Sequence, residues 1–582
     1  MLLVRKLLIA VAFSAAVVSV VASAANGRSS QESASTSLLM PGVTYTREVD
    51  FTSRGPIVLD VVTAPKPDGK VYSLAPALSN DRLLGRETLT RLETRVAAGA
   101  TTVAIDGDYF KRATGVPNGI LMQNGLLESA PASGRSSLGI AADGTLTTAR
   151  VSLAGIWQGS GQRRPLLLNT SGDKGKFTLY TPAYGPRTPR ESGVLEAVLG
   201  TFPPARPGTA LEGTVTRVAG GGPTAIPRGG AVIVARGSQS TAQLKAEAPV
   251  GQQVQVLLSL SPDWSGLASA IGGGPLLVRD GRPIFHADEP FEARQLNGRQ
   301  PRGAIGQLPD GRILLVGVEG TKPSYSIGMS NYELAVELSR LGATTAFGLG
   351  AGSAAGLAFD GKLLTRLSAG VQEKLSDALV LSYTGVYAAP PFSPVLSPNG
   401  DGVGDSETLT YRVVRPSQVV ATLAGPGGAK IQLANGAVSP GLRTLAWNGT
   451  VSGAPAPEGS WTFAVSGKDD RGITTRAERT FSLDDTLSSL AVTIGAHGWP
   501  TATFRLARAA TIVVQIQRRN GVRVATLRSG KGAAGSQVVT WRGRIAGRRA
   551  PGGRYQVAVQ ATSSVGTSSL AAQFTYHSHK RH

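Results

Sequence analysis

The feature that most constrains the fold is an internal repeat with a spacing of 94 residues. The segment WNGTVSGAPAPEGSWTFAV, which begins at Trp447, aligns without gaps on WRGRIAGRRAPGGRYQVAV, which begins at Trp541. Each copy combines short alternating strands with a Gly/Pro turn, at a length that suits an immunoglobulin-like β-sandwich. The sequence therefore predicts two all-β modules, at residues 396–485 and 486–576, followed by a basic tail at 577–582. We expect Trp447 and Trp541 to be core anchors, with sugar stacking as the alternative.

A different kind of region precedes the repeat. Strand-like runs such as PIVLDVV and RILLVGV alternate with a few helical patterns over residues 41–387, and the Pro-rich stretch at 388–395 is typical of a linker. Ser330 and Glu333 form a capping-box pair and Gly342 suits the C-terminal cap, while a second apolar stripe runs over 87–98. This pattern predicts an α/β or mixed-sheet α+β domain.

The first residues carry the pattern of a secretory signal. Arg5 and Lys6 precede an apolar run at 7–21, and small residues follow up to Ala24. We expect a signal peptide at 1–24 and a Ser-rich spacer at 25–40, although the same run could be an uncleaved anchor. No later segment is apolar for long enough to span a membrane, so the sequence predicts a secreted, cell-wall-associated protein.

The side chains that the chain lacks exclude several chemistries. It has no cysteine, which removes thiolate catalysis and Cys-ligated zinc, and it has only five histidines. Of these, His286 alone lies in the first two thirds of the sequence. That distribution argues against a His-based zinc site or a Ser-His-Asp triad there.

Positive charge is concentrated at the C-terminal end. The formal net charge is +21, and fourteen Lys and Arg but no Asp or Glu follow Asp485. For an exported protein, an anionic wall or capsule polysaccharide is the expected partner rather than nucleic acid. The alternative is a solvated Arg-rich surface that serves solubility.

The first module opens with SPNGDGVGDSE, in which Asn399, Asp401 and Asp405 resemble the early positions of a calcium-binding loop. The alternative is an Asn-Gly and Asp-Gly turn. This segment, with the WxG…PxPxGxY ending, resembles flagellar hook-capping-type immunoglobulin-like domains over residues 396–576. That resemblance implies support or tethering rather than catalysis.

A glycine-rich stretch, RLGATTAFGLGAGSAAGLAFDG, begins at Arg340. It contains the loose G-x-G-x-x-A form of a dinucleotide fingerprint, but the following LAFDGKLLTR has the Asp-Gly signature of a hairpin rather than a helix. It also lacks the Lys-Ser or Lys-Thr pair of a phosphate-binding loop. We therefore expect no nucleotide cofactor.

Six ordered motifs over residues 41–387 resemble the phosphodiester glycosidase family. They are AIDGDYF, VPNGILMQNGLL, LYTPAYG, IGGGPLLVRDGRP, QPRGAIG and VEGTKPSYSIGMSNYELAVELSRLGA. The family includes the lysosomal enzyme that uncovers mannose 6-phosphate and bacterial proteins linked to exopolysaccharide. The resemblance implies hydrolysis of sugar phosphodiesters.

The chain departs from the family at positions that carry chemistry. The glycine-rich stretch usually reads like ALNLDGGGSS in the family, so its Asp is replaced here by Gly350. In the motif usually written NGGYF, the Asn is Asp106 and the second Gly is Asp108. The acid of a family DGR motif is Glu319, and the usual Thr after Arg302 is Gly303.

Cleavage of a sugar–phosphate bond needs a carboxylate near the sugar carbon, a group that activates water, and donors that hold the phosphate. We expect Asp106, Asp108 and Glu319 to supply the carboxylates and Arg302 to hold the phosphate. Taken singly, each acid also suits a turn or an ion pair. The resemblance places these residues toward the substrate: Gly107, Gly273, Gly274, Gly350, Gly352 and Ser353.

Two functions follow from this reading. The first is a secreted glycosidase that acts on sugar-phosphate linkages of envelope or extracellular polysaccharide. The second is a catalytically impaired relative that binds anionic cell-wall polysaccharide.

Overall fold

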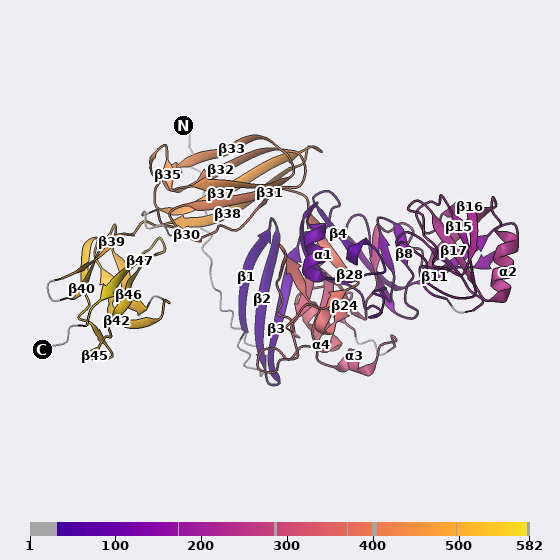
Figure 1. Ribbon diagram of the computed structural model, residues 1–582, viewed down its shortest axis with the longest axis horizontal. Helices are drawn as coiled ribbons and strands as arrows, with labels where there is room; N and C mark the ends of the chain where they lie inside the picture. The colour runs from indigo at the N-terminus through magenta and orange to yellow at the C-terminus, as the bar shows by residue number, and fades with distance from the viewer. Residues whose placement is uncertain are drawn as a thin grey trace, which may run out of the picture.

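The computed structural model describes residues 32–172, 174–284, 288–368, 370–398, 404–495, 498–518 and 520–578. Figure 1 shows an elongated molecule with a small β-rich lobe at one end, the main N-terminal region in the middle and two sandwiches at the other end. The expected signal peptide lies outside the described residues. Within the described ranges, no helix has the length and apolar character needed to cross a membrane.

The main region is built on an eight-stranded antiparallel sheet, which we call the large sheet. Its strands, in spatial order, are β1 (Glu32–Met40), β2 (Val43–Thr52), β3 (Gly55–Ala64), β23 (Ile313–Val318), β22 (Arg302–Gln307), β24 (Thr345–Ala351), β20 (Leu276–Arg279) and β21 (Arg282–Pro283). The central strands are buried on both faces, which explains their unbroken apolar runs.

A second sheet, the central sheet, packs against it. Its strands are β26 (Lys362–Leu363), β25 (Leu357–Phe359), β6 (Thr101–Asp106), β28 (Asp377–Tyr383) and β4 (Tyr72–Leu78). The apolar core between the two sheets includes Ile305 and Phe347 of the large sheet and Ile105 and Leu379 of the central sheet.

Helices cover the outer faces of both sheets. Helix α1 (Leu89–Val96) packs on the central sheet through Leu89 and Leu92, beside a short ribbon of β5 (Glu87–Thr88) and β27 (Lys374–Leu375). Helix α4 (Asn331–Arg340) packs on the large sheet. The capping box of Ser330 and Glu333 at its start is confirmed. The order of layers is therefore helix, sheet, sheet, helix.

The rest of this region is β-structure. A side sheet contains β10 (Leu146–Arg150), β9 (Ser136–Ile140), β19 (Ser269–Ile271), β7 (Leu121–Gln123) and β8 (Leu126–Ser129). The end lobe carries α2 (Ser238–Glu247) and an eight-stranded sheet of β12 (Arg164–Pro165), β11 (Ser152–Gln158), β18 (Gln253–Ser261), β16 (Ala210–Gly220), β15 (Val194–Leu199), β17 (Ala231–Arg236), β14 (Phe177–Tyr180) and β13 (Leu167–Leu168). Strand thus predominates, and the expected α/β class holds only in part.

The first repeat copy is a two-sheet sandwich. One sheet contains β29 (Tyr387–Ala388), β31 (Glu407–Val413) and β34 (Gly441–Trp447). The other contains β30 (Val395–Leu396), β38 (Thr474–Leu483), β37 (Gly459–Asp469), β32 (Ser417–Ala424) and β33 (Lys430–Val438). A small hairpin of β35 (Thr450–Val451) and β36 (Ala454–Pro455) follows Trp447.

The second copy repeats this plan. Its sheets contain β39 (Leu487–Ile494), β40 (Pro500–Leu506) and β43 (Gly535–Thr540), and β42 (Arg523–Gly532), β41 (Ala510–Arg518), β46 (Gly553–Thr562) and β47 (Thr567–Tyr576). The matching small hairpin is β44 (Arg544–Ile545) and β45 (Arg548–Arg549). Trp447 and Trp541 are buried in the two cores, as the core-anchor interpretation predicts.

Two expectations about connecting segments need correction. The expected spacer contains β1, which pairs with β2 from Glu32 to Met40 and forms the edge of the large sheet. The expected linker contributes β29 and β30, which hydrogen-bond to strands of the first sandwich. Pairing with neighbouring strands satisfies backbone groups that a free spacer would leave to water.

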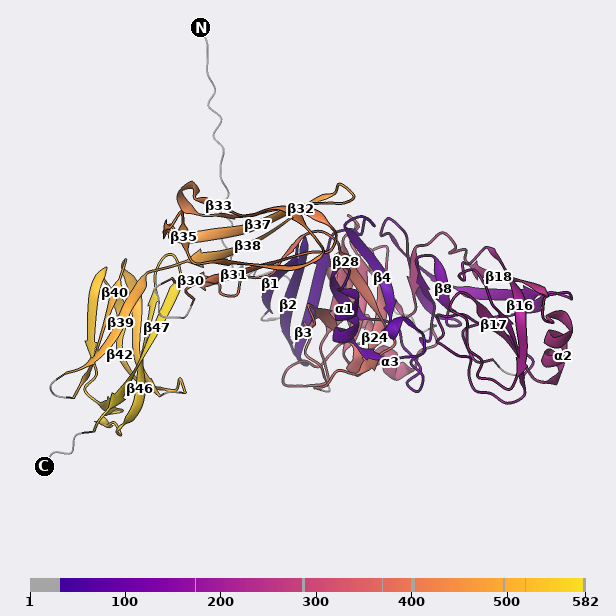
Figure 2. The same cartoon turned by 45° about the horizontal axis from the view of Figure 1, so that its top comes forward.

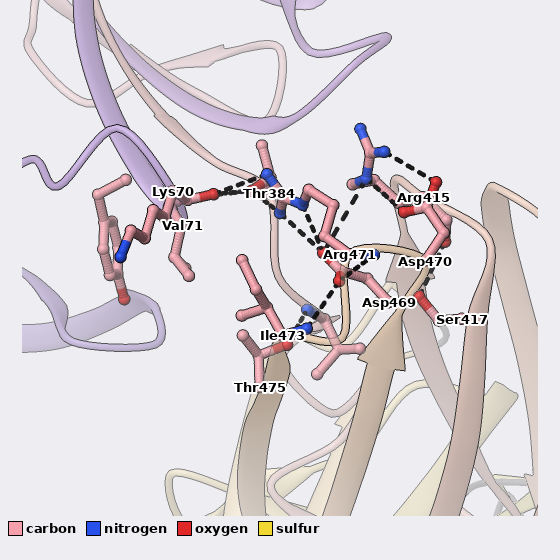
Figure 3. A network of polar contacts seen from close by, with 12 residues as sticks. Lys70, Val71, Thr384, Arg415, Ser417, Asp469, Asp470, Arg471, Ile473 and Thr475 are labelled. Atoms are coloured by element: carbon pink, nitrogen blue, oxygen red, sulfur yellow. Dashed lines mark hydrogen bonds and ion pairs between the residues drawn. The ribbon is translucent and has the colours of Figure 1, made fainter. Parts of the chain in front are cut away.

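The first sandwich is docked onto the main region through two arginines. Arg471 donates to the backbone oxygen of Lys70 (2.9 Å) and to Oγ1 of Thr384 (3.2 Å), while Asp469 holds its guanidinium from within the sandwich (Figure 3). These contacts join β37 and the turn after it to the strand ends at Lys70 and Thr384.

Arg479 makes the second set of contacts. Its guanidinium donates to the backbone oxygens of Leu38 (2.9 Å), Leu39 (2.8 Å) and Ala388 (2.8 Å). It therefore ties β1, the start of the first sandwich and β38 together. Figure 2 shows this sandwich over the N-terminal strands and the second sandwich beyond it.

Candidate active site

A cavity of about 400 Å³ opens where the carboxyl ends of β6 and β24 meet. The two strands belong to different sheets, and the backbone N–H of Gly350 donates to the oxygen of Gly107 (2.7 Å) to join them. Another wall is the segment that leads into α3 (Ala293–Asn297). The residues that carry polar or aromatic groups into the lining include Asp106, Asp108, Tyr109, Arg135, Phe291 and Gln295.

Asp106 ends β6 with its carboxyl group buried. Its Oδ1 accepts a hydrogen bond from the backbone N–H of Gly356 (2.9 Å), whereas Oδ2 has no hydrogen-bond partner among the described residues. Burial, with a smaller contribution from the nearby charge of Asp377, raises the pKa of Asp106 well above its usual range. This carboxyl group is therefore suited to carry a proton near neutral pH.

Asp108 lies two residues further on and is held differently. Its oxygens accept hydrogen bonds from the backbone N–H groups of Tyr109 (2.7 Å) and Gly119 (2.5 Å). Burial raises the pKa of Asp108 to about 6, and the positive charge of Arg135 opposes that increase. The ionised form of Asp108 therefore predominates at neutral pH, whereas burial favours the protonated form of Asp106.

A third carboxyl group, Asp377 at the start of β28, is one that the sequence analysis missed. Its Oδ1 accepts the backbone N–H of Asp108 (2.8 Å), and its Oδ2 accepts a hydrogen bond from the hydroxyl of Ser376. Burial, followed by repulsion from Asp108, raises the pKa of Asp377 to about 7. The signal was a lone acid at the head of the apolar run DALVLSY. Asp377 holds the backbone on which Asp108 sits.

Arg135 supplies positive charge at the cavity and was also missed. Its guanidinium carbon lies 4.1 Å from the ring centre of Phe291 and 4.8 Å from that of Tyr109. The guanidinium lies against both rings, which also contact each other with centres 5.7 Å apart, and its N–H groups can still donate to a ligand. Arg135 Nε has no hydrogen-bond partner in the described part of the chain. This arginine therefore suits an anionic group of a ligand.

Gly350 faces Asp106 across the cavity wall. A Cβ atom at position 350 would lie 2.5 Å from Oδ2 of Asp106, and one at position 303 would lie 2.6 Å from Oδ1. Contacts that short do not occur without displacement of the carboxyl group. The side chain of Asp106 therefore fills space that glycine leaves open at both neighbouring strands.

Arg302 does not reach the cavity, and its expected role as the phosphate-binding group is corrected. Its guanidinium is buried and donates to the backbone oxygens of Met329, Gln295 and Gly298 and to Oδ1 of Asn331, at 2.7 to 2.8 Å. Four protein acceptors engage its donors, which fixes α3 and the start of α4 to the large sheet. Arg302 builds the cavity wall rather than binding the ligand.

Glu319 is also separate from the cavity, so it does not join the other two acids. It is buried beside Asp60, pairs with Arg47 (3.1 Å) and accepts the backbone N–H of Arg366 (2.6 Å). Arg47 also pairs with Asp60 (3.0 Å). The interpretation of Glu319 as an ion-pair residue fits this arrangement better than a catalytic one.

The candidate substrate-binding positions divide into two groups. Gly107 and Gly350 line the cavity. Gly274 uses its N–H to bind the oxygen of Gly348 (2.8 Å), a Cβ at Gly273 would meet that same oxygen at 2.7 Å, and Gly352 donates to the oxygen of Pro301 (2.9 Å). These N–H groups of Gly274 and Gly352 are therefore used within the protein. Ser353 follows in a short turn after β24.

The glycine-rich stretch forms strands rather than a nucleotide fingerprint. β24 runs into a single 3-10 turn at Gly352–Ala354, and β25 pairs with β26 across Asp360 and Gly361, which both have positive φ. This is the hairpin that the Asp-Gly pair predicts. No α-helix begins at these glycines, so there is no helix N-terminus for a pyrophosphate.

The expected calcium ligands lie only partly within the described residues. Asn399 and Asp401 lie outside the described residues, as does His286, while Asp405 lies within them. Among the described residues, no three Asp, Glu or His side chains are grouped so that they could hold a metal ion. Calcium binding at Asn399, Asp401 and Asp405 remains a prediction.

A buried group of carboxyl groups beside an arginine in one cavity defines a site for acid–base chemistry on an anionic ligand. Comparison with known families places two parts of the chain. A phosphodiester glycosidase family model matches residues 208–382, and an FlgD immunoglobulin-like domain model matches residues 491–564. Both resemblances are therefore confirmed.

Individual relatives are distant and cover part of the chain. A prophage-derived uncharacterized protein YomE of Bacillus subtilis is 30% identical over 118 residues, 20% of this chain and 18% of that protein. A hypothetical protein from Synechocystis has a related structure, with a TM-score of 0.50 and 27% identity over 59% of this chain and 62% of that one. The catalytic domain of zebrafish N-acetylglucosamine-1-phosphodiester alpha-N-acetylglucosaminidase aligns at a TM-score of 0.33 and 13% identity, over 60% of this chain and 87% of that one.

Proposed function

We propose that the protein is a glycosidase that hydrolyses sugar-phosphate linkages of envelope or extracellular polysaccharide. The observation that carries this proposal is the contact between Asp106 and Gly350. Where the family usually has Asp, this chain has Gly350, and where the family usually has Asn, it has Asp106. Because the two positions face each other at one cavity, the carboxyl group lost from β24 is matched by one gained at the end of β6, and Asp108 adds a further carboxyl group to the same lining.

Together, Asp106, Asp108 and Arg135 support a complete hydrolysis. Asp106 carries a proton, which it gives to the bridging oxygen as the bond between that oxygen and the sugar carbon breaks. The Asp108 carboxylate stabilises positive charge on the sugar carbon and accepts a proton from the water that adds there. Arg135 holds the non-bridging phosphate oxygens. The products are a free sugar hydroxyl and a phosphate monoester.

The test is a four-member cycle on a chromogenic sugar phosphodiester: wild type, Asp106→Asn, Gly350→Asp, and the double variant. Asp106→Asn should lower kcat by about 10²- to 10⁴-fold, as expected for one acid–base group. Gly350→Asp should also lose activity, because its Cβ would lie 2.5 Å from Asp106 Oδ2. The double variant restores the usual family residues at positions 106 and 350 and should regain activity relative to both single variants.

Asp310→Asn, at an exposed acid that pairs only with its neighbour Arg312, is the matched control and should leave kcat unchanged. Circular dichroism and thermal melting must show that each variant is folded. An inert wild type that gains activity in Gly350→Asp would favour the second function, an impaired relative that binds polysaccharide. Inactivity of all four folded proteins would overturn the proposal.

We further propose that the protein acts outside the cytoplasm, on the basis of its N-terminal signal pattern. Its partner is then an anionic polysaccharide rather than nucleic acid. Calcium at Asn399, Asp401 and Asp405 belongs to the same proposal, as a structural ion with no part in the reaction.

A further inference from the structure

The second sandwich has a cluster of arginines at one end. Six exposed arginines lie on two hairpin turns and on the first residues of β46: Arg518, Arg523, Arg544, Arg548, Arg549 and Arg554. We call this end the basic tip. Figure 1 shows β45 at the end of the module away from β30 and the first sandwich.

The strand geometry separates the basic tip from the junction with the first sandwich. β46 begins at Gly553 in the tip and ends at Thr562, next to Ser563, which hydrogen-bonds to Thr486 (3.2 Å) and Asp484 (3.4 Å) at the junction. A ten-residue strand is roughly 30 Å long, so the tip stands about that far from the junction. The tip is therefore the end of this module that lies away from the first sandwich and is open to another molecule.

The charges at the tip are not balanced within the module. No Asp or Glu follows Asp485 in the sequence, so the strands of the second sandwich contain no acidic side chain. Arg544 and Arg549 are directly opposite each other on β44 and β45, and like charges in that position destabilise a hairpin. The tip therefore presents clustered positive charge with no acidic side chain contributed by residues 486–576.

The tip also has a concave surface. An open depression of about 360 Å³ is lined by Arg518, Asn520, Gly552, Gly553 and Arg554. Nearby, the guanidinium of Arg542 lies over the ring of Trp499, 5.6 Å from its centre, and Trp499 is 38% exposed. Flat aromatic and guanidinium surfaces beside spaced cations suit a chain of sugar rings with regularly spaced anions.

We propose that the basic tip is a binding site for an anionic sugar-phosphate polysaccharide, separate from the cavity at Asp106. The choice of polysaccharide rests on the proposed function, because a polymer held at the tip is presented to the cavity of the same chain. Linking the two sites raises the local concentration of substrate without any new contact at the cavity.

The test uses the full chain with Asp106→Asn, so that binding is measured without turnover. The probes are phosphomannan, the same mannan after removal of its phosphate, and double-stranded DNA of similar charge. Arg548→Gln with Arg554→Gln should weaken phosphomannan binding by about tenfold at low ionic strength, and binding should decline as salt rises. The matched pair Arg505→Gln with Lys531→Gln removes the same charge from the other end of the module and should change affinity by less than about threefold.

The outcomes separate this inference from the proposed function. Selective loss in the tip variant, with no binding of dephosphorylated mannan, supports the tip as a site even if the cavity proves inert. In an active chain, the tip variant should keep wild-type kcat/KM on a small chromogenic substrate and lose it on the polymer. Equal losses in both charge-matched variants, no binding in dilute buffer, or equal or tighter binding of DNA would each overturn the inference.

Discussion

Three buried carboxyl groups lie at or beside one cavity and have different roles in holding and moving protons. Asp377 accepts a hydrogen bond from the backbone N–H of Asp108, Arg135 favours the ionised form of Asp108, and burial favours the protonated form of Asp106 by raising its pKa. Their different surroundings separate their pKa values, and such separation is what assigns acid and base roles to similar side chains. The residue-scale predictions follow from these differences.

The pH dependence of activity should report Asp108. Since its pKa is about 6, kcat/KM should decline below about pH 6 as the carboxylate takes up a proton. Arg135→Ala removes the charge that lowers this pKa, so the acid limb should move to higher pH and KM should rise. Arg135→Lys should keep the limb near its original place. A limb that stays fixed in Arg135→Ala would show that the two groups are not coupled.

Stability should depend on pH through Asp377. Its pKa is raised to about 7 in the folded protein, so the folded state binds more protons than the unfolded state between about pH 4 and 7. The stability that this group contributes is therefore present at low pH and lost as pH rises through 7. Asp377→Asn should gain stability over wild type on the order of 1–3 kcal/mol at pH 8 and little or none at pH 4. Urea denaturation at the two pH values measures this, and a pH-independent difference would contradict it.

Some of the site could be predicted from sequence, and the rest depends on contacts that cross between sheets. Asp106 and Asp108 follow a buried strand, and a family pattern marks them. Arg302 also stands in a family motif, but its N–H groups donate to four acceptors from other segments of the chain. Arg135 is positioned at the cavity by contacts with the rings of Tyr109 and Phe291, which come from distant parts of the chain. No local pattern reports such pairings.

At the scale of elements, the cavity exists because strands of two sheets end side by side. Gly350 on β24 and Gly107 after β6 are joined by one backbone hydrogen bond, and a side chain at Gly107 would meet Asp377 Oδ1 at 1.9 Å. The capped helix α4 and the Asp-Gly hairpin were predictable because their signals are local. The edge strand β1 was not, since its Ser-rich sequence gains strand structure only by pairing with β2.

The opening loop of the first sandwich should respond to calcium. If Asn399, Asp401 and Asp405 bind the ion in the folded state only, calcium should raise the melting temperature. At a calcium concentration of 100 times Kd, the added free energy of unfolding is about 2.7 kcal/mol. Asp401→Ala should abolish the shift, and magnesium at equal concentration should not reproduce it. Identical melting in calcium and in chelator would leave the segment as a turn.

At the scale of the whole molecule, the first sandwich and the main region form one docked unit. Arg471 and Arg479 between them donate to four backbone oxygens and one hydroxyl across or beside the contact. Backbone acceptors fix position closely because they cannot rotate away. The contact therefore fixes the first sandwich relative to the main region, and Ser563 of the second sandwich bonds to Thr486 and Asp484 at the junction between the two sandwiches.

Substitution of both arginines should uncouple these parts. Arg471→Ala with Arg479→Ala removes the donors while leaving both cores intact, so calorimetry should resolve separate transitions for the main region and the first sandwich, which we expect to melt together in the wild type. Protease cleavage near 388–395 should become faster. Arg443→Ala with Arg476→Ala, on exposed parts of the same sandwich, is the control and should leave a single transition. A single unchanged transition in the docking variant would contradict this account.

The docked sandwich has a consequence for the products of polymer cleavage. A polymer held by a tethered domain that swings freely is cut at any spacing from its point of attachment. If the basic tip anchors the polymer and the second sandwich keeps a fixed direction on the docked first sandwich, bonds close to the anchored segment cannot enter the cavity. Digestion would then leave an uncut polymer segment of a minimum length, and the shortest products would report the distance between the basic tip and the cavity.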